Sequence, residues 1–293
     1  MDIWVFGGAK KMNRGYFYVL IAVLLFTFVP VFARILLPYI NVESMTFFRF
    51  MFAVIALIII SSVKKVRIFK RIDRKEAIAY AGLGIIYVLV VYTYTLAVSY
   101  IHIANVQFLQ QTSPVFTFIF AYLFLRESVK RSLYYSLIIA MSGAFIIFYF
   151  SASSIFGNQF IGNILAFVSG IFLAGYTTLS RHIGRKYPTL QATTWAFIFG
   201  SIFMSFSLFN VPDLSVSNWI LLILFGIFAT AMPFLLYVKS MEYIEAQKAS
   251  LLLLLTVVTT PVAAFLFFQE IPSLASFIGG SLILLSSAIV LKK

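Results

Sequence analysis

The sequence contains no cysteine and few charged residues. Without cysteine, the chain has no disulfide, no thiolate nucleophile and no cysteine metal ligand. Charged residues make up 11% of its 293 residues and apolar residues 62%, whereas soluble domains are about 25% charged and about 45–50% apolar. A soluble fold has no place for so much apolar surface. The composition therefore predicts a protein that lies in a lipid bilayer, most of it as membrane-spanning helices.

Acidic residues are the scarcer charged class, with 9 Asp and Glu against 22 Lys and Arg. All of the acids fall in loops or at the ends of apolar runs, so none lies in the middle of a predicted span. The two histidines, His102 and His182, have no metal-ligand partner at a usable spacing, and no Walker-type phosphate loop is present. We therefore expect no metal, no cofactor and no ATPase subunit. A membrane-embedded enzyme is disfavoured because it would need catalytic groups clustered within the spans.

Apolar runs of about 20 residues, the length that crosses a bilayer, recur along the chain. Bounded by charges, Pro, Gly or Asn, they predict ten membrane-spanning helices at 16–37, 42–63, 77–97, 103–125, 133–150, 159–180, 190–210, 218–238, 249–268 and 273–291. The first fourteen residues contain only a short apolar stretch. We therefore expect no removable signal peptide.

The basic residues alternate between loops. With a cytoplasmic N-terminus, the inner segments hold 3, 7, 3, 3, 2 and 2 of the 22 Lys and Arg, or 20 in all, and the outer loops hold none. The remaining two, Arg34 and Arg49, lie within the first two spans. Positive loops face the cytoplasm, so the pattern predicts a multi-pass protein of the cell (plasma or inner) membrane with both termini cytoplasmic. It also explains the net charge of +13 without nucleic-acid binding.

The chain contains a weak internal repeat. A shift of 143 residues places Tyr94 on Tyr237, Ile101 on Ile244 and Glu127 on Glu270, and a shift of 147 places Arg34 on Arg181. Five spans per half is an odd number, so the second half would cross the membrane in the opposite direction. Inverted repeats are a common plan of secondary transporters, with a substrate site between the halves. An ion channel is the other alternative, but its symmetry more often comes from an oligomer.

Two stretches carry a family resemblance. Residues 92–127, and residues 226–270 with their FFQE ending, resemble the half-repeat of the drug/metabolite transporter superfamily, EamA-type; FFRFMFAVIALI at 47–58 resembles an early element of that family. The resemblance implies an all-α integral membrane fold of ten transmembrane helices in two inverted five-helix repeats. It also implies transport of small metabolites such as amino acids. On this view the chain consists of a cytoplasmic segment, 1–15, and two five-helix repeats, 16–150 and 159–291.

One departure from the family pattern concerns a helix kink. Pro114 lies thirteen residues before Glu127, but Val257 stands at that spacing before Glu270, and Pro261 follows one helical turn later. Because proline kinks a helix, we expect the kink in the ninth span one turn nearer the outside.

Several polar side chains within the spans are candidates for substrate binding. Arg49 has no acid at its depth: it either snorkels outward or bonds helix-end carbonyls, or it anchors an anionic group of the substrate. Gln107 and Gln111 share a helix face and either join helices or line a wet cavity. Tyrosines could form the aromatic belt or contact substrate. The candidate set is Arg49, Tyr94, Gln107, Gln111, Tyr176 and Tyr237.

The sequence thus favours a secondary transporter, an exporter, facilitator or exchanger, that carries a small molecule by alternating access. Because no Asp, Glu, His or Lys lies at mid-span, we expect facilitation or exchange rather than proton coupling. We also expect Glu43 to pair with Arg34 across the first outer loop.

Overall fold

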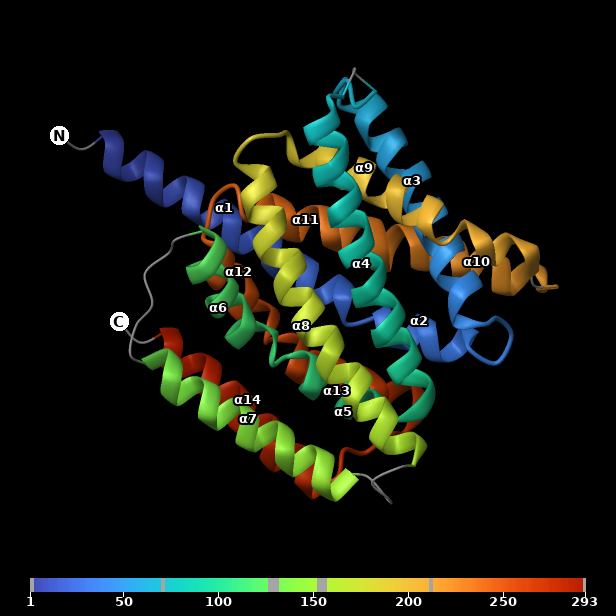
Figure 1. Ribbon diagram of the computed structural model, residues 1–293, viewed down its shortest axis with the longest axis vertical. Helices are drawn as coiled ribbons and strands as arrows, with labels where there is room; N and C mark the ends of the chain where they lie inside the picture. The colour runs from blue at the N-terminus through green and yellow to red at the C-terminus, as the bar shows by residue number, and fades with distance from the viewer. Residues whose placement is uncertain (1–2, 70–71, 126–131, 152–156, 211–212, 292–293) are drawn as a thin grey trace.

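A computed structural model describes residues 3–69, 72–125, 132–151, 157–210 and 213–291, and these residues form helices and no strands (Figure 1). The first half of the chain contains α1 (Ile3–Phe26), α2 (Val29–Leu36), α3 (Val42–Val63), α4 (Arg74–Tyr100), α5 (Ile103–Gln110), α6 (Ser113–Leu125) and α7 (Ser132–Ser151). The second half contains α8 (Asn158–Gly184), α9 (Thr189–Phe203), the 3-10 helix η1 (Ser205–Asn210), α10 (Val216–Gly226), the π-helical segment η2 (Ile227–Ala231), α11 (Met232–Ser240), α12 (Ala246–Leu253), α13 (Thr256–Phe268) and α14 (Leu274–Leu291).

Six helical segments among the described residues are long and apolar enough to cross a membrane. They are Arg14–Leu36, Val42–Val63, Arg74–Tyr100, Ile103–Leu125, Asn158–Gly184 and Val216–Ser240. Shorter apolar helices occur at Ile138–Ile147, Thr256–Phe268 and Leu274–Ser286. The prediction of an all-helical multi-pass protein is confirmed, while the count of ten spans stays a prediction.

Two of the spans are broken in the middle, and the breaks have the same register. Residues 111–112 separate α5 from α6, and residues 254–255 separate α12 from α13. Adding 143 to the bounds of α5 and α6 gives the bounds of α12 and α13. The predicted shift of the kink toward Pro261 is therefore wrong, because α13 continues through that proline. In the first half, Pro114 is the second residue of α6, whereas the second residue of α13 is Val257. The break before α13 must therefore be held by contacts from other helices.

The first long helix of each half packs against the other half at a glycine. A Cβ on Gly15 would lie 2.9 Å from side-chain atoms of both Tyr243 and Ile244, and a Cβ on Gly162 would lie 2.8 Å from Tyr100 and Ile101. Helix α1 thus packs on the α11–α12 connection, and α8 packs on the α4–α5 connection. In Figure 1 the last helices of the two halves, α7 and α14, lie side by side along one edge.

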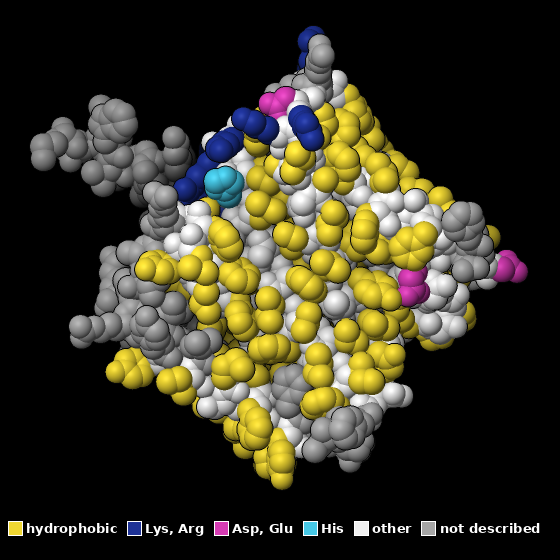
Figure 2. Space-filling view, viewed as in Figure 1, with side chains coloured by type: hydrophobic (Ala, Val, Ile, Leu, Met, Phe, Trp, Pro, Cys, Tyr) yellow, Lys and Arg dark blue, Asp and Glu magenta, His cyan; other side chains and the backbone are white. Residues whose placement is uncertain are grey.

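On one face of the molecule, basic side chains gather at one end and apolar side chains cover most of the rest (Figure 2). Figure 2 shows Lys and Arg gathered at the upper edge, over the α3–α4 connection and the end of α8, with hydrophobic side chains covering most of the face below. Exposed side chains at this end include Lys64, Lys65, Arg67, Arg185 and Lys186. Bases at one end of an apolar body are typical of a membrane protein. Glu127 and the bases Arg126, Lys130 and Arg131 lie outside the described residues.

Candidate functional site

A cavity of about 520 Å³, its opening included, lies between helices of both halves. Its polar lining consists of Arg49 from α3, Tyr94 from α4, Gln107 and Gln110 from α5, Gln111 from the break after α5, and Thr256 from the start of α13. The rest of the lining is apolar and includes Phe26 and Phe234. A few polar groups on an otherwise apolar wall are typical of small-molecule sites.

Arg49 is buried and held by neutral groups. Its side chain is 1% exposed, and its Nε donates a hydrogen bond of 2.9 Å to Thr230 Oγ1. The guanidinium carbon lies 4.0 Å from the ring centroid of Phe225, a cation–π contact that stabilises a buried cation. Within the described part of the chain, Nη1 has no hydrogen-bond partner. Arg49 therefore does not snorkel outward, and its charged Nη1 group is buried without a bond to the described residues.

The position of Thr230 depends on an irregular helix. It lies in the π-helical segment η2, and its hydroxyl donates to the carbonyl of Phe225, five residues earlier. Gly226 permits the close approach to α3, because a Cβ there would lie 2.8 Å from the Arg49 carbonyl oxygen. π-Helical turns often mark functional sites. Sequence reasoning missed Thr230 and Phe225, although Pro233 gave a signal of irregular helix in that span.

The three glutamines of α5 and the following break are joined to other helices. Gln107 Oε1 accepts from the Tyr94 hydroxyl at 3.1 Å, and Gln107 Nε2 donates to Thr256 Oγ1 at 2.5 Å. Gln111 Nε2 donates to the same oxygen at 2.9 Å. Gln110 Nε2 donates to Ser169 Oγ on α8 at 2.9 Å. These glutamines thus join helices and also line a cavity, so both of the roles considered for them apply.

The hydroxyl of Thr256 determines how Gln111 points. Thr256 donates its one proton to the Leu253 carbonyl at 2.5 Å, so its oxygen can only accept from the two glutamines. Both glutamines must therefore present their NH₂ groups to it. This leaves Gln111 Oε1 directed away, and it has no hydrogen-bond partner among the described residues. The arrangement explains why the helix breaks between α12 and α13 without a proline there.

Two of the predicted site residues do not line the cavity. Tyr237 is buried and shares a 3.0 Å hydrogen bond with Thr177 on α8. Tyr176 is also buried, and its ring lies 5.5 Å from that of Phe234, a cavity residue. Both tyrosines belong to the packing behind the cavity wall. The structure brings the other four predicted residues, Arg49, Tyr94, Gln107 and Gln111, together at one cavity.

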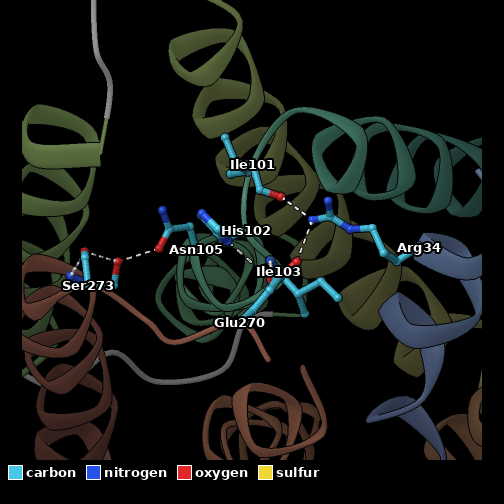
Figure 3. A network of polar contacts seen from close by, with 8 residues as sticks. Arg34, Ile101, His102, Ile103, Asn105, Glu270 and Ser273 are labelled. Carbon is cyan, nitrogen blue, oxygen red and sulfur yellow. Dashed lines mark hydrogen bonds and ion pairs between the residues drawn. The ribbon is translucent and has the colours of Figure 1, made fainter. Parts of the chain in front are cut away.

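A second polar network lies near the start of α5 (Figure 3). Arg34 Nη2, from α2, lies 3.3 Å from Glu270 Oε1 and donates to the Ile101 carbonyl at 2.7 Å. Glu270 Oε2 accepts from the Ile103 amide at 2.9 Å and lies 3.6 Å from His102 Nδ1. The network thus joins α2, the α4–α5 connection and the segment after α13.

The predicted pairing of Glu43 with Arg34 is wrong. Glu43 Oε1 accepts a 2.7 Å hydrogen bond from the hydroxyl of Tyr92, and Arg34 turns to Glu270 instead. The physical reason is that Glu270 and the Ile101 carbonyl together offer Arg34 two acceptors at one place. No group of three His, Asp or Glu suited to a metal ion occurs among the described residues.

Comparison with known proteins gives relatives along most of the chain. A transporter of Archaeoglobus fulgidus is 30% identical over 230 residues, or 76% of this chain and 81% of that protein. The pseudopaline exporter CntI of Pseudomonas aeruginosa is 23% identical over 209 residues, or 69% and 71%. A transporter of Clostridium kluyveri is 25% identical over 289 residues, or 95% and 93%. One crystal structure is similar with a TM-score of 0.70 at 15% identity over 94% of this chain and 96% of that chain, which shows a shared fold.

The model of the EamA-like transporter family matches the chain twice, over residues 13–149 and 160–292. These two matches cover both stretches that carry the resemblance noted in the sequence. The chain belongs to the EamA-like transporter family, within the drug/metabolite transporter superfamily.

Proposed function

We propose that this protein is a secondary transporter that carries small metabolites, such as amino acids or related compounds, across the cell membrane by alternating access. The observation that carries the proposal is the cavity between the two halves, with a buried arginine that keeps an unpartnered N–H group. A charged group without a partner is costly to bury in a membrane protein, and such residues mark functional sites. We assign it the role of anchoring an anionic group of the substrate.

Alternating access requires two similar halves that can exchange conformations, and three observations support such halves here. The broken helices have bounds that differ by 143 residues, the glycine contacts of α1 and α8 are equivalent in the two halves, and the family model matches each half. We propose ten spans in two inverted five-helix repeats, 16–150 and 159–291, after a cytoplasmic segment 1–15.

The Arg34–Glu270 network closes one end of the transport path in this proposal. Ile103 begins α5 and Gln107 lines the cavity four residues later, about 6 Å along the helix axis. The network therefore lies about one turn beyond the cavity, on the side that we propose to face outward. Its contacts join elements of both halves, so they would have to separate when the halves move to open that end.

The relatives support transport over the two alternatives. One relative is named as an exporter, of pseudopaline, which favours export of a small organic molecule. A membrane-embedded enzyme would need catalytic groups at the cavity, and its described polar lining contains one arginine, a tyrosine, three glutamines and a threonine. A channel would need a continuous pore, which the Arg34–Glu270 network and the broken helices oppose.

The test is counterflow in proteoliposomes loaded with a panel of unlabelled metabolites and given the labelled compound outside. A carrier gives saturable uptake that is stimulated by the same compound inside, and Arg49→Gln should reduce that uptake at least 10-fold with normal folded yield. Flux that does not saturate and is not stimulated from the other side would identify a channel instead. Loss of uptake in Arg49→Gln together with loss of folded protein would make Arg49 a structural residue.

The proposed orientation is tested by single cysteines, since the native chain has none. Asp213→Cys should react with a membrane-impermeant maleimide on intact cells, and Lys64→Cys should react only after permeabilisation. Both sites are exposed, so unequal labelling reports the side of the membrane and not burial. The opposite pattern would reverse the proposed topology.

A further inference from the structure

Two residues that line the same cavity each have a buried polar atom without a hydrogen-bond partner among the described residues, and the two atoms are complementary in kind. Arg49 Nη1 is a charged donor, and Gln111 Oε1 is a neutral acceptor. Arg49 is 1% and Gln111 2% exposed, so bulk water does not satisfy them. Among the other polar lining residues, Tyr94, Gln107 and Gln110 each form a hydrogen bond to a side chain, and Thr256 is saturated by its two donors and one acceptor.

A ligand that satisfies both atoms must bring an anionic acceptor for Arg49 and a donor for Gln111. The donor is best neutral, because Arg49 is the one charged residue in the described lining and no carboxylate there could neutralise an ammonium group. Burying an unpaired cation is costly. Apart from its polar groups the lining is apolar, with Phe26, Val29, Leu173 and Phe234 among its members, so the body of the ligand is apolar as well.

We infer that the cavity binds a small organic monoanion that carries one carboxylate and one neutral hydroxyl or N–H donor on an apolar body, in preference to zwitterions and cations. This inference rests on the cavity being the substrate site of the proposed transporter. It narrows the substrate from the small metabolites proposed above to hydroxylated or amide-bearing organic acids, and it disfavours free amino acids, which are zwitterions. The carboxylate binds at Arg49 and the donor at Gln111.

Binding to the purified protein in detergent, measured by calorimetry, tests the inference without requiring transport. The parent probe is 3-phenylpropanoate. Its hydroxylated forms, 3-phenyllactate and 3-(4-hydroxyphenyl)propanoate, place the donor near to and far from the carboxylate. Phenylalanine is the zwitterionic analogue and 3-phenyllactamide the neutral one. We expect at least one hydroxylated acid to bind about 2- to 10-fold more tightly than the parent, as one added hydrogen bond predicts. Phenylalanine and the amide should bind more weakly than both the parent acid and that hydroxylated acid.

Variants assign each group of the ligand to its residue. Arg49→Gln should weaken all the acids by roughly 10- to 100-fold, the loss expected for a charged hydrogen bond, and bring them level with the amide. Gln111→Leu should abolish the gain from the hydroxyl, so that the hydroxylated acids bind to this variant no more tightly than the parent acid does. Gln111→Met is a second variant if leucine prevents folding. Ser142→Ala is the control outside the cavity, since this exposed hydroxyl bonds the Ile138 carbonyl of its own helix, and it should retain the gain.

Three results would overturn the inference. The first is that no hydroxylated acid binds more tightly than the parent, and the second is that phenylalanine binds more tightly than any of the acids. The third is that chloride alone occupies the Arg49 site and no organic acid competes with it. Binding as expected but without counterflow would leave the inference standing while contradicting the proposed transport function, so the two failures are distinguishable.

Discussion

Arg49 and its neighbours form a site in which a cation is stabilised entirely by neutral groups. The ring of Phe225 covers one side of the guanidinium, and this ring is itself stacked on Phe32 at 5.5 Å. Thr230 supplies one hydrogen bond. A carboxylate partner would have neutralised Arg49 and removed its ability to attract an anion, so its absence from the described surroundings suits a binding role.

At the same scale, Thr256 is expected to hold the glutamines in place. Thr256→Val removes the acceptor of two amide groups, which would then be buried without a partner. We expect a loss of about 1–3 kcal/mol in the free energy of unfolding, seen as a lower melting temperature in detergent. Thr256→Ser keeps the hydroxyl and should lose much less. A melting temperature for Thr256→Val equal to that of the lipid-side control Ser142→Ala, whose hydroxyl bonds only its own helix, would contradict this account.

At the scale of the helix, α10, η2 and α11 form one span whose middle is not regular α-helix. The π-helical turn rotates Thr230 toward Arg49, and Gly226 allows the two helices to approach. The breaks after α5 and α12 act in the same way, since they place Gln111 and Thr256 in the lining of the cavity. Irregular segments of this kind supply the polar groups of a site in an otherwise apolar bundle.

Gly226→Ala tests the close approach of α10 to α3. The new Cβ would lie 2.6 Å from Phe52 Cβ and 2.8 Å from the Arg49 carbonyl oxygen, so the helices must move apart. We expect a destabilisation of about 1–3 kcal/mol, the usual cost of overpacking, and weaker ligand binding at Arg49. Gly184→Ala is the matched control, because nothing lies within 4 Å of a Cβ there. Equal melting temperatures for the two variants would show that α10 and α3 are free to separate.

The Arg34–Glu270 contact can be tested as a gate between elements. A cysteine at Val91, a buried cavity residue, reports access of an impermeant thiol reagent added outside. Arg34→Gln should raise the labelling rate of this cysteine roughly 5-fold, because loss of the ion pair destabilises the closed state by about 1 kcal/mol. Lys248→Gln breaks an exposed pair with Glu245 and should have no effect. An unchanged rate in Arg34→Gln would mean that the network is not the closing element.

At the scale of the whole molecule, two halves enclose a cavity that lacks a group able to change charge during transport. The described lining offers Tyr, Gln and Thr besides Arg49, and none of these side chains titrates in the physiological range. Glu43 and Glu245 are the acids that could move toward the path, but Glu43 is bonded to Tyr92 and Glu245 is paired with Lys248 at 3.3 Å. We therefore expect the proposed carrier to run on its substrate's own gradient or to exchange solutes.

Transport is therefore expected to be independent of a pH gradient. In proteoliposomes with the membrane potential clamped at zero, an imposed pH gradient should not drive the substrate found by counterflow above equilibrium. Protein-free liposomes measure the passive entry of weak acids. If the substrate accumulates above the level in protein-free liposomes, and a protonophore abolishes this accumulation, the prediction is contradicted and transport is coupled to protons.

The sequence by itself indicated that this protein lies in a lipid bilayer and is helical, because apolar run length and loop charge are local properties that do not depend on how helices pack. The family was visible as a resemblance of residues 92–127 and 226–270. The sequence also identified Arg49 and the glutamines as candidates, because a polar residue inside an apolar run is visible from the run alone. The partners of these residues were decided only by the tertiary structure. Arg49 meets Thr230 across 181 positions of the chain, and Gln107 meets Thr256 across 149.

Such contacts depend on the rotation and depth of each helix, which are set by close packing at positions such as Gly226 and Gly162. For the same reason Arg34 lies against Glu270 and not against Glu43, although Glu43 is much nearer in sequence. Likewise the break before α13 keeps the register of its counterpart without the proline, because Thr256 is held by Gln107 and Gln111. Hydrophobicity places a helix in the bilayer, but only its neighbours determine which of its side chains meet.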